Sequence, residues 1–197
     1  LYEMYGDITF LEENYEAMKK YLRSFEAKKE NGLIVEGFEY GDWLSLDGDR
    51  YFGERPFGGT DEMLIANIFY AVSLKITAKS AKLLGKHEEA LKIEDYCKDT
   101  INKIQAEYFT FNGRIVCETV TAQVLALHFD IVPQQHRERL ARDLNKNVIK
   151  YKYHVITGFL GTPYLLFALA DNGYFETARR VLMNHSYPGW FYEVDMG

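Results

Sequence analysis

The residues best suited to chemistry are crowded into one loop, "GFEYGDWLSLDG", residues 37 to 48. It combines the indole of Trp43 with the carboxylates of Asp42 and Asp47, a phenol and several glycines. Aromatic rings stack on the C–H faces of sugars, and carboxylates accept hydrogen bonds from vicinal hydroxyls. The loop therefore indicates carbohydrate recognition. A local role is the alternative, in which Asp42 ties the loop through backbone N–H groups and Trp43 plugs the core beneath it.

Two further long loops, residues 109–118 and 152–161, and the C-terminal tail carry similar side chains. If these segments converge with the first loop, they form one polar and aromatic mouth. The candidates that they and the first loop contribute are Glu36, Asp42, Trp43, Asp47 and Asp49, then Asn112, Arg114, Glu118 and Thr119, then Tyr153, His154, Thr157 and Gly158, and finally Tyr187, Trp190 and Tyr192.

Other kinds of site are not indicated. The histidines have no mutual spacing that predicts a metal site, and neither cysteine, Cys97 or Cys117, fits a metal or disulfide pattern. Ser45 and Ser186 lack the context of a catalytic triad, and the Gly-Gly-Thr stretch at 58–60 is too short for a phosphate loop. We therefore expect no metal and no cofactor.

Composition limits the class of protein. The chain has 197 residues, 47% of them hydrophobic, which is enough for one ordinary domain with a sizeable core. Its formal net charge of -6 argues against nucleic acid or an anionic membrane as a partner. No apolar run is long enough to span a bilayer.

Apolar residues at steps of three and four predict helices along most of the chain. The first begins at Thr9, where Thr9 and Glu12 have the spacing of a capping box, and the next is expected to be capped by Thr60. The remaining helices alternate between nearly all-apolar and strongly amphipathic, which predicts helical hairpins. The expected inner, apolar helices are 61–84, 120–131 and 162–171, and the outer helices are 87–107, 135–150 and the "YFETARRVLMNH" segment.

Hairpins with one buried and one exposed helix close naturally into a ring whose inner helices line the axis. We therefore expect the inner helices to be more buried than the outer ones, and any β structure to be confined to the long loops. Three hairpins form only half of a six-hairpin ring, so the apolar flanks of the first and last helices should be uncovered. The alternative architecture is a solenoid of tetratricopeptide-like helix pairs that acts as a scaffold.

Several longer stretches then resemble a known family. "YGDITFLEENYEAMKKYL", "GDWLSLDG", "AKLLGKHEEA", "TAQVLALHFDIVP" and "ITGFLGTPYLLFALADNGYFETARRVLMNHSYPGW" follow one another in this order. Together they closely resemble the catalytic domain of bacterial α-L-rhamnosidases, glycoside hydrolase family 78, over essentially the whole chain. The most specific pieces are the loop at 41–44 and the turn at 157–162.

The resemblance implies an all-α fold in which helical hairpins form part of an (α/α)6 barrel, with residues 1–197 as a partial catalytic domain. It also implies hydrolysis of terminal α-L-rhamnose from glycosides with inversion, without a metal. The family's general acid lies before the equivalent of Leu1 and its general base after the equivalent of Gly197. We therefore expect no catalytic residue within this chain, and no activity from the fragment alone. A non-catalytic carbohydrate-binding or helical-repeat scaffold module is the alternative function.

For the sugar site we select Asp42, Trp43, Thr157 and Gly158 as substrate-binding residues. Asp42→Asn is expected to weaken binding and to change stability little, because the amide keeps the shape of the carboxylate. The expected partners are rhamnose-containing glycosides and the remaining parts of the parent chain, with a homodimer as an option. A cytoplasmic location is expected, with secretion as the alternative.

Overall fold

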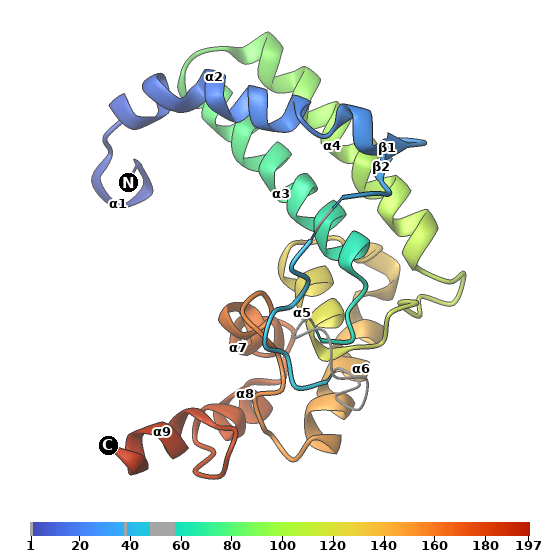
Figure 1. The fold of residues 1–197 in the computed structure, drawn as a ribbon, viewed down its shortest axis with the longest axis vertical. Helices are drawn as coiled ribbons and strands as arrows, with labels where there is room; N and C mark the ends of the chain where they lie inside the picture. Colours follow the sequence, from blue (N-terminus) through green and yellow to red (C-terminus); the bar gives the residue numbers. More distant parts are fainter. Residues whose placement is uncertain (1, 38, 48–57) are drawn as a thin grey trace. The chain divides into compact units, whose positions relative to one another are not determined.

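A computed structural model describes residues 2–37, 39–47 and 58–197 (Figure 1). Asp49, one of the predicted site residues, lies outside these ranges. The chain divides into two compact units, which we describe separately. The first consists of Leu1–Phe38 and Ala66–Ile104, and the second of Glu39–Ile65 and Gln105–Gly197. The single domain predicted for residues 1–197 stays a prediction.

In its described residues the first unit contains three long helical segments and four short elements (Figure 1). Its main helices are α2 (Thr9–Arg23), most of α3 (Glu62–Leu83) and most of α4 (His87–Tyr108). The short turn between α3 and α4 makes them an antiparallel pair, and the ion pair between Lys82 and Glu94 joins their surfaces at 2.5 Å. The remaining elements are α1 (Tyr2–Tyr5), the 3-10 helix η1 (Glu26–Lys28) and a two-stranded antiparallel sheet of β1 (Lys29–Glu30) and β2 (Leu33–Ile34).

A buried cation fastens β1 to the helices of this unit. The side chain of Lys29 is only 5% exposed. Its Nζ donates hydrogen bonds to Tyr70 Oη at 2.6 Å, Tyr96 Oη at 3.0 Å and Glu26 Oε1 at 2.9 Å. Burial acts to lower the pKa of Lys29, but these hydrogen bonds outweigh it and the pKa is raised. The ammonium group therefore stays charged inside the unit.

Two helix starts differ from the sequence prediction. The capping box of Thr9 and Glu12 does not form; instead Asp7 Oδ1 accepts the hydrogen bond of the Thr9 N–H at 2.9 Å. At α3, Asp61 Oδ1 accepts from the Leu64 N–H at 2.6 Å, so Asp61 caps the helix. The Thr60 hydroxyl pairs with Thr119 Oγ1 at 2.7 Å. In both cases an aspartate one or two residues from the predicted threonine accepts the hydrogen bond, because a carboxylate is a strong acceptor at the positive end of a helix.

The second unit contains the ends of α3 and α4 and two further helical pairs (Figure 1). α5 (Val120–His128) is capped by Thr119, whose hydroxyl accepts from the Ala122 N–H at 3.2 Å. The 3-10 helix η3 (Gln134–His136) leads into α6 (Arg137–Lys150), which packs on α5. α7 (Thr162–Ala170), with Pro163 in its first turn, packs against α5 and α8 (Phe175–Leu182). The last helix is α9 (Trp190–Met196).

Burial follows the predicted order of inner and outer helices. All residues of α5 from Val120 to Leu127 are buried, whereas α6 buries only one face, and α3 is likewise more buried than α4. The predicted uncovered flank is also present, since Phe167 of α7 is 58% exposed and Phe175 of α8 is 69% exposed. Strand structure in the described residues is confined to β1, β2 and one bridge between Phe109 and Ile115. None of the helices in these residues is both long and apolar enough to cross a bilayer.

Candidate carbohydrate-binding site

Two of the loops that the sequence expects to converge meet in the second unit. The segment 42–47 lies against the segment 156–161: the Leu46 N–H donates to the carbonyl oxygen of Ile156 at 2.7 Å, and Ser45 Oγ donates to the same oxygen at 2.9 Å. On the other side, the Gly59 N–H donates to Asp47 Oδ1 at 3.0 Å. Segments that are far apart in sequence therefore form one junction.

Asp42 is the centre of this junction and is completely buried. Its Oδ2 accepts hydrogen bonds from the Gly158 N–H at 2.7 Å and from the Thr121 hydroxyl. Its Oδ1 accepts from the N–H groups of Leu160 at 2.9 Å and Gly161 at 3.1 Å. A carboxylate offers about four acceptor positions. All of them are used here, so the geometry assigns Asp42 the local role, and direct contact with a sugar stays a prediction.

Glycine is needed at 158 because the two segments touch. A Cβ on Gly158 would lie 2.3 Å from the carbonyl oxygen of Trp43 and 2.5 Å from that of Asp42. Both obstacles are backbone atoms, which cannot rotate away. The Gly158 N–H donates to Asp42, and a contact of Gly158 with substrate stays a prediction.

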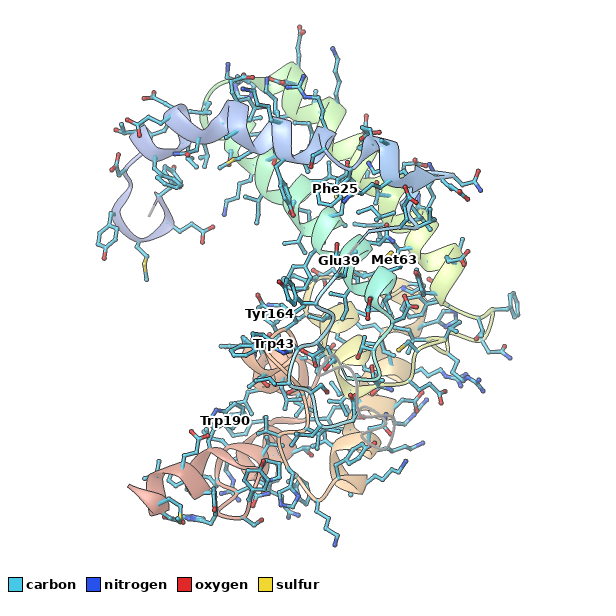
Figure 2. All side chains as sticks on the ribbon, in the orientation of Figure 1. Phe25, Glu39, Trp43, Met63, Tyr164 and Trp190 are labelled. Carbon is cyan, nitrogen blue, oxygen red and sulfur yellow. The ribbon has the colours of Figure 1, made fainter. Side chains whose placement is uncertain are left out.

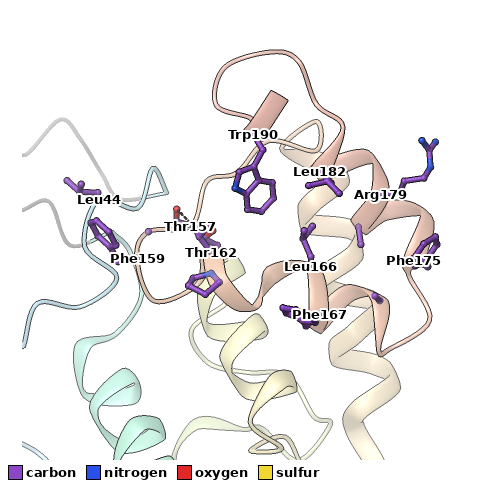
Figure 3. A pocket seen from close by; sticks show the side chains of 14 residues that line it. Leu44, Thr157, Phe159, Thr162, Leu166, Phe167, Phe175, Arg179, Leu182 and Trp190 are labelled. Atoms are coloured by element: carbon purple, nitrogen blue, oxygen red, sulfur yellow. Dashed lines mark hydrogen bonds between the residues drawn. The ribbon is translucent and has the colours of Figure 1, made fainter. Parts of the chain in front are cut away.

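Thr157 is also committed to the loop. Its side chain is 6% exposed, and its Oγ1 pairs with Thr162 Oγ1 at 2.8 Å (Figure 3). Thr162 Oγ1 also donates to the carbonyl oxygen of Thr157 at 3.0 Å. Thr157 thus shapes the turn into α7, and a contact with substrate through its hydroxyl stays a prediction.

Trp43 differs from the other three residues because its side chain reaches the surface (Figure 2). The residue is 42% exposed, and its indole is a neighbour of two further rings. Its ring centroid is 5.7 Å from that of Phe159 and 6.2 Å from that of Tyr40. The carbonyl oxygen of Trp43 accepts from the Phe159 N–H at 3.0 Å, which fixes the loop that carries Phe159. Of the four predicted residues, Trp43 offers the face on which a sugar can stack.

Tyr40 and Phe159 were not selected from the sequence. Both stood in motifs that the sequence singled out, one beside "GDWL" and the other inside "TGFLGT". The sequence feature that could have identified them is an aromatic residue in a glycine-rich loop, because such a side chain has no helix or strand face to pack on. Their nearness to Trp43 could not be read from the spacing.

The other predicted candidates are dispersed. Glu36 belongs to the first unit, whereas the junction belongs to the second. Arg114 and Glu118 pair with each other at 3.0 Å, and Arg139 donates to the carbonyl oxygen of Asn112 at 2.7 Å. His154 Nε2 lies 2.8 Å from Ser186 Oγ. The remaining contacts are those of Arg180 with Tyr153 Oη at 3.1 Å and of the Tyr187 ring with that of Tyr192 at 5.5 Å.

Two cavities open beside the junction. The larger, about 700 Å³, is almost entirely apolar and lies along α7 and α8, from Leu44 and Phe159 at one end to Phe175 at the other (Figure 3). The smaller, about 320 Å³, is lined by Thr157, Trp190, Tyr192 and Glu193 among others. Among the described residues lining these two cavities, Glu193 is the one carboxylate.

Shifted pKa values do not identify a proton-transfer group in these cavities. Burial raises the pKa of Tyr108, with a further contribution from nearby Asp61, and burial lowers the pKa of His128. Neither side chain lines either cavity. The described residues also contain no group of three or more His, Cys, Asp or Glu side chains placed to hold a metal ion. The arrangement is suited to binding a ligand by stacking.

Comparison with known proteins identifies the family. Residues 1–197 match the family model described as the bacterial alpha-L-rhamnosidase 6 hairpin glycosidase domain. The chain therefore belongs to this rhamnosidase family. The helical pairs described above are accordingly those of a six-hairpin glycosidase domain, and the all-α fold class is confirmed.

Individual rhamnosidases resemble the whole chain. An α-L-rhamnosidase of Formosa agariphila is 34% identical over 199 residues, and one of Streptomyces avermitilis is 32% identical over 197. In both comparisons all of this chain is covered, but only 21% and 18% of the relative. This chain thus spans about a fifth of the curated rhamnosidases that it matches.

Solved structures agree with the sequence comparisons. The crystal structure of the S. avermitilis α-L-rhamnosidase complexed with L-rhamnose superimposes with a TM-score of 0.88 at 31% identity, covering 100% of this chain and 18% of that one. The native α-L-rhamnosidase of Aspergillus terreus gives a TM-score of 0.87 at 26% identity, with 97% and 22% covered.

Proposed function

We propose that this rhamnosidase-family chain is part of an enzyme that removes terminal α-L-rhamnose from glycosides, with inversion at the anomeric carbon. The observation that carries the proposal is the family match over residues 1–197. The relative from S. avermitilis, which is complexed with L-rhamnose, supports the choice of sugar.

In this proposal Trp43 supplies a stacking face for the rhamnose ring. Three features support this role: the indole is partly exposed, it lies on a loop held by hydrogen bonds, and it borders the turn at 158–161. Asp42, Gly158 and Thr157 then act indirectly: Asp42 and Gly158 join the two loops, and Thr157 shapes the turn into α7.

Inverting hydrolysis needs two carboxyl groups about 6.5–9.5 Å apart, one to protonate the leaving oxygen and one to activate water. The described cavities offer Glu193 and no facing partner. We propose that the acid and the base are supplied by parts of the whole protein outside residues 1–197. The chain would then contribute the sugar platform, and other segments the proton transfers.

The test uses the whole protein that carries this chain and p-nitrophenyl α-L-rhamnoside. Trp43→Ala should lower kcat/KM by about tenfold or more, since an aromatic contact is worth on the order of 1 kcal/mol beyond the buried area. Ile149→Ala, which trims a 45% exposed side chain of the outer helix α6, is the control. Equal rates in wild type and Trp43→Ala would contradict the role of Trp43.

The isolated 197-residue chain tests whether the catalytic acid and base lie outside it. We expect no release of p-nitrophenol above background from it. Turnover by the isolated chain would overturn this part, and Glu193 would become the first candidate to replace by Gln. A whole protein that binds rhamnosides without hydrolysing them would instead support the non-catalytic carbohydrate-binding function.

A cytoplasmic location and a homodimeric assembly are further proposals, resting on the sequence alone. Cell fractionation and light scattering of the purified whole protein test them.

A further inference from the structure

We propose that a groove between α2 and α4 of the first unit is a further binding site, and that its ligand is a small amphipathic carboxylate, an apolar body with one negative charge. The cavity in this groove has a volume of about 370 Å³, within the range of small-molecule sites. All the residues that line it belong to the first unit, whereas the carbohydrate site lies in the second. We call this cavity the α2/α4 groove; it lies between Leu22 and Arg23 of α2, Tyr70 and Leu74 of α3, and Lys92 and Tyr96 of α4.

The floor of the α2/α4 groove is apolar. Leu22 and Leu74 line it and are buried, and Ile93 adds a half-buried side chain from α4. Tyr70, which is also buried, and the half-buried Tyr96 lie beside them. A hydrocarbon body placed on this floor would lose contact with water, which favours its binding.

Both carboxylates that line the groove already bind cations of the protein. Glu89 Oε1 accepts a hydrogen bond from Lys19 Nζ at 2.8 Å. Glu26 Oε1 accepts from Lys29 Nζ at 2.9 Å and from the Tyr70 hydroxyl at 3.5 Å. These two carboxylates are therefore not available to recognise a cationic ligand.

Two cations at the groove have no carboxylate partner. Arg23, in the last turn of α2, donates through Nε to the carbonyl oxygen of Lys19 at 3.3 Å, and its two terminal nitrogens have no hydrogen bond with any described residue. Lys92 of α4 likewise forms neither an ion pair nor a hydrogen bond within the described ranges. Both side chains are exposed, one from each helix. A guanidinium group presents parallel N–H groups that fit a carboxylate, and an ammonium group can approach the same oxygens.

The local charge has the opposite sign to that of the whole chain. The formal net charge of the chain is -6, but three cationic side chains and only two carboxylates line the α2/α4 groove. The buried ammonium group of Lys29 adds to this excess, because it binds the hydroxyls of both tyrosines that line the groove. An anion is therefore the favoured ligand, and an excess of one charge on the lining fits a monocarboxylate better than a doubly charged phosphate.

The test compares a charged ligand with an uncharged one of the same shape. Isothermal titration calorimetry of the whole protein that carries this chain is performed with 3-phenylpropanoate and with 3-phenylpropanamide. We expect a Kd of about 1 mM or tighter for the acid, and binding that is weaker by about tenfold for the amide. Added salt should weaken the binding of the acid, since the attraction is between charges. A saturating concentration of L-rhamnose should not change the Kd of the acid.

Two variants locate the bound acid. Arg23→Gln and Lys92→Gln should each weaken the acid by about three- to tenfold and leave the amide unchanged, because only the acid uses their charges. Arg142→Gln is the matched control, since it removes an exposed arginine from α6 in the second unit. It should bind the acid as the wild type does.

Several results would overturn the proposal. Equal affinities for acid and amide, or an acid affinity unchanged in either variant, would contradict the role of the two cations. Inorganic phosphate that binds as tightly as the acid and displaces it would show a site for simple anions. Competition by L-rhamnose would place the acid in the carbohydrate site. No binding at millimolar concentrations would mean that the groove is covered in the whole protein or has no affinity for the acid. None of these measurements uses hydrolysis, so their outcome is separate from that of the proposed rhamnosidase function.

Discussion

The backbone N–H of Gly158 donates a 2.7 Å hydrogen bond to Oδ2 of Asp42, a residue 116 positions earlier in the chain. This contact joins the loop before α3 to the loop before α7, and Trp43 and Phe159 follow directly from its two ends. The carboxylate is therefore a positioning group, and the exposed rings beside it are the surface that we propose for a ligand.

The first prediction concerns Asp42→Asn. We expect the free energy of unfolding to fall by about 2–5 kcal/mol, because the amide nitrogen would face two buried N–H or hydroxyl donors that now lack an acceptor. This differs from the sequence-based expectation that the amide would be harmless to stability. That expectation considered shape and not the direction of the hydrogen bonds. Urea unfolding of the two proteins measures the loss, and a change below about 0.5 kcal/mol would contradict the hydrogen-bond arrangement.

The second prediction compares two Gly→Ala substitutions, one that causes a steric clash and one that only requires an unfavourable backbone conformation. Gly158→Ala should destabilise by several kcal/mol, since its Cβ would press on the backbone of Trp43 and Asp42. Gly173→Ala is the control. Gly173 has a φ of +89°, but a Cβ added there would meet no atom within 4 Å. Only the backbone conformation is therefore unfavourable for alanine, by about 1–2 kcal/mol. Thermal melts of both variants give the order. An equal loss in the two would show that the loops separate easily.

The third prediction is a pH dependence that originates at His128. The imidazole lies against the rings of Tyr164, at 4.6 Å, and Phe129, at 4.9 Å, and burial lowers its pKa below the ordinary 6.5. As the pH falls below 6.5, the unfolded chain takes up a proton that the folded chain resists, so stability decreases until the pH passes the folded pKa. Above 6.5 this group has no effect.

His128→Gln should therefore flatten the loss of stability between pH 7.5 and 5.5, apart from a constant offset for the lost ring contacts. Melting temperatures across that range measure the slope. Ile149→Ala, which trims an exposed side chain of α6 and changes no titratable group, is the control and should keep the wild-type slope. A slope unchanged in His128→Gln would place the dependence elsewhere.

The fourth prediction tests the buried cation of the first unit. Lys29→Met should lower the free energy of unfolding by about 2–3 kcal/mol, because charge-assisted hydrogen bonds to Tyr70, Tyr96 and Glu26 are lost while the aliphatic stem is kept. Tyr96→Phe removes one of the three and should cost less. In a double-mutant cycle the two changes should be non-additive, since they share a hydrogen bond. Additive losses would mean that the bond to Tyr96 contributes nothing.

The sequence by itself determined the helical pairs. An apolar run such as Val120–Leu127 can only be satisfied by burial on all sides, and the charged stripe of α6 requires water on one side. Pro163 marks the first turn of α7, as predicted. These features depend on the properties of neighbouring residues, which is why a period of three to four could reveal them. The grouping of indole and carboxylate in one loop likewise indicated sugar binding.

Only the tertiary structure decided which of the predicted residues face outward. Asp42 and Trp43 are adjacent in sequence and were assigned the same role, but the carboxylate is buried and the indole is exposed. The acceptors of Asp42 are filled by donors 79 to 119 positions away. The nearness of Phe159 to Trp43 follows from the same long-range contact. A hydrogen bond between distant backbone groups depends on where folding brings the two loops, and the local conformational preferences that a sequence displays do not contain that information.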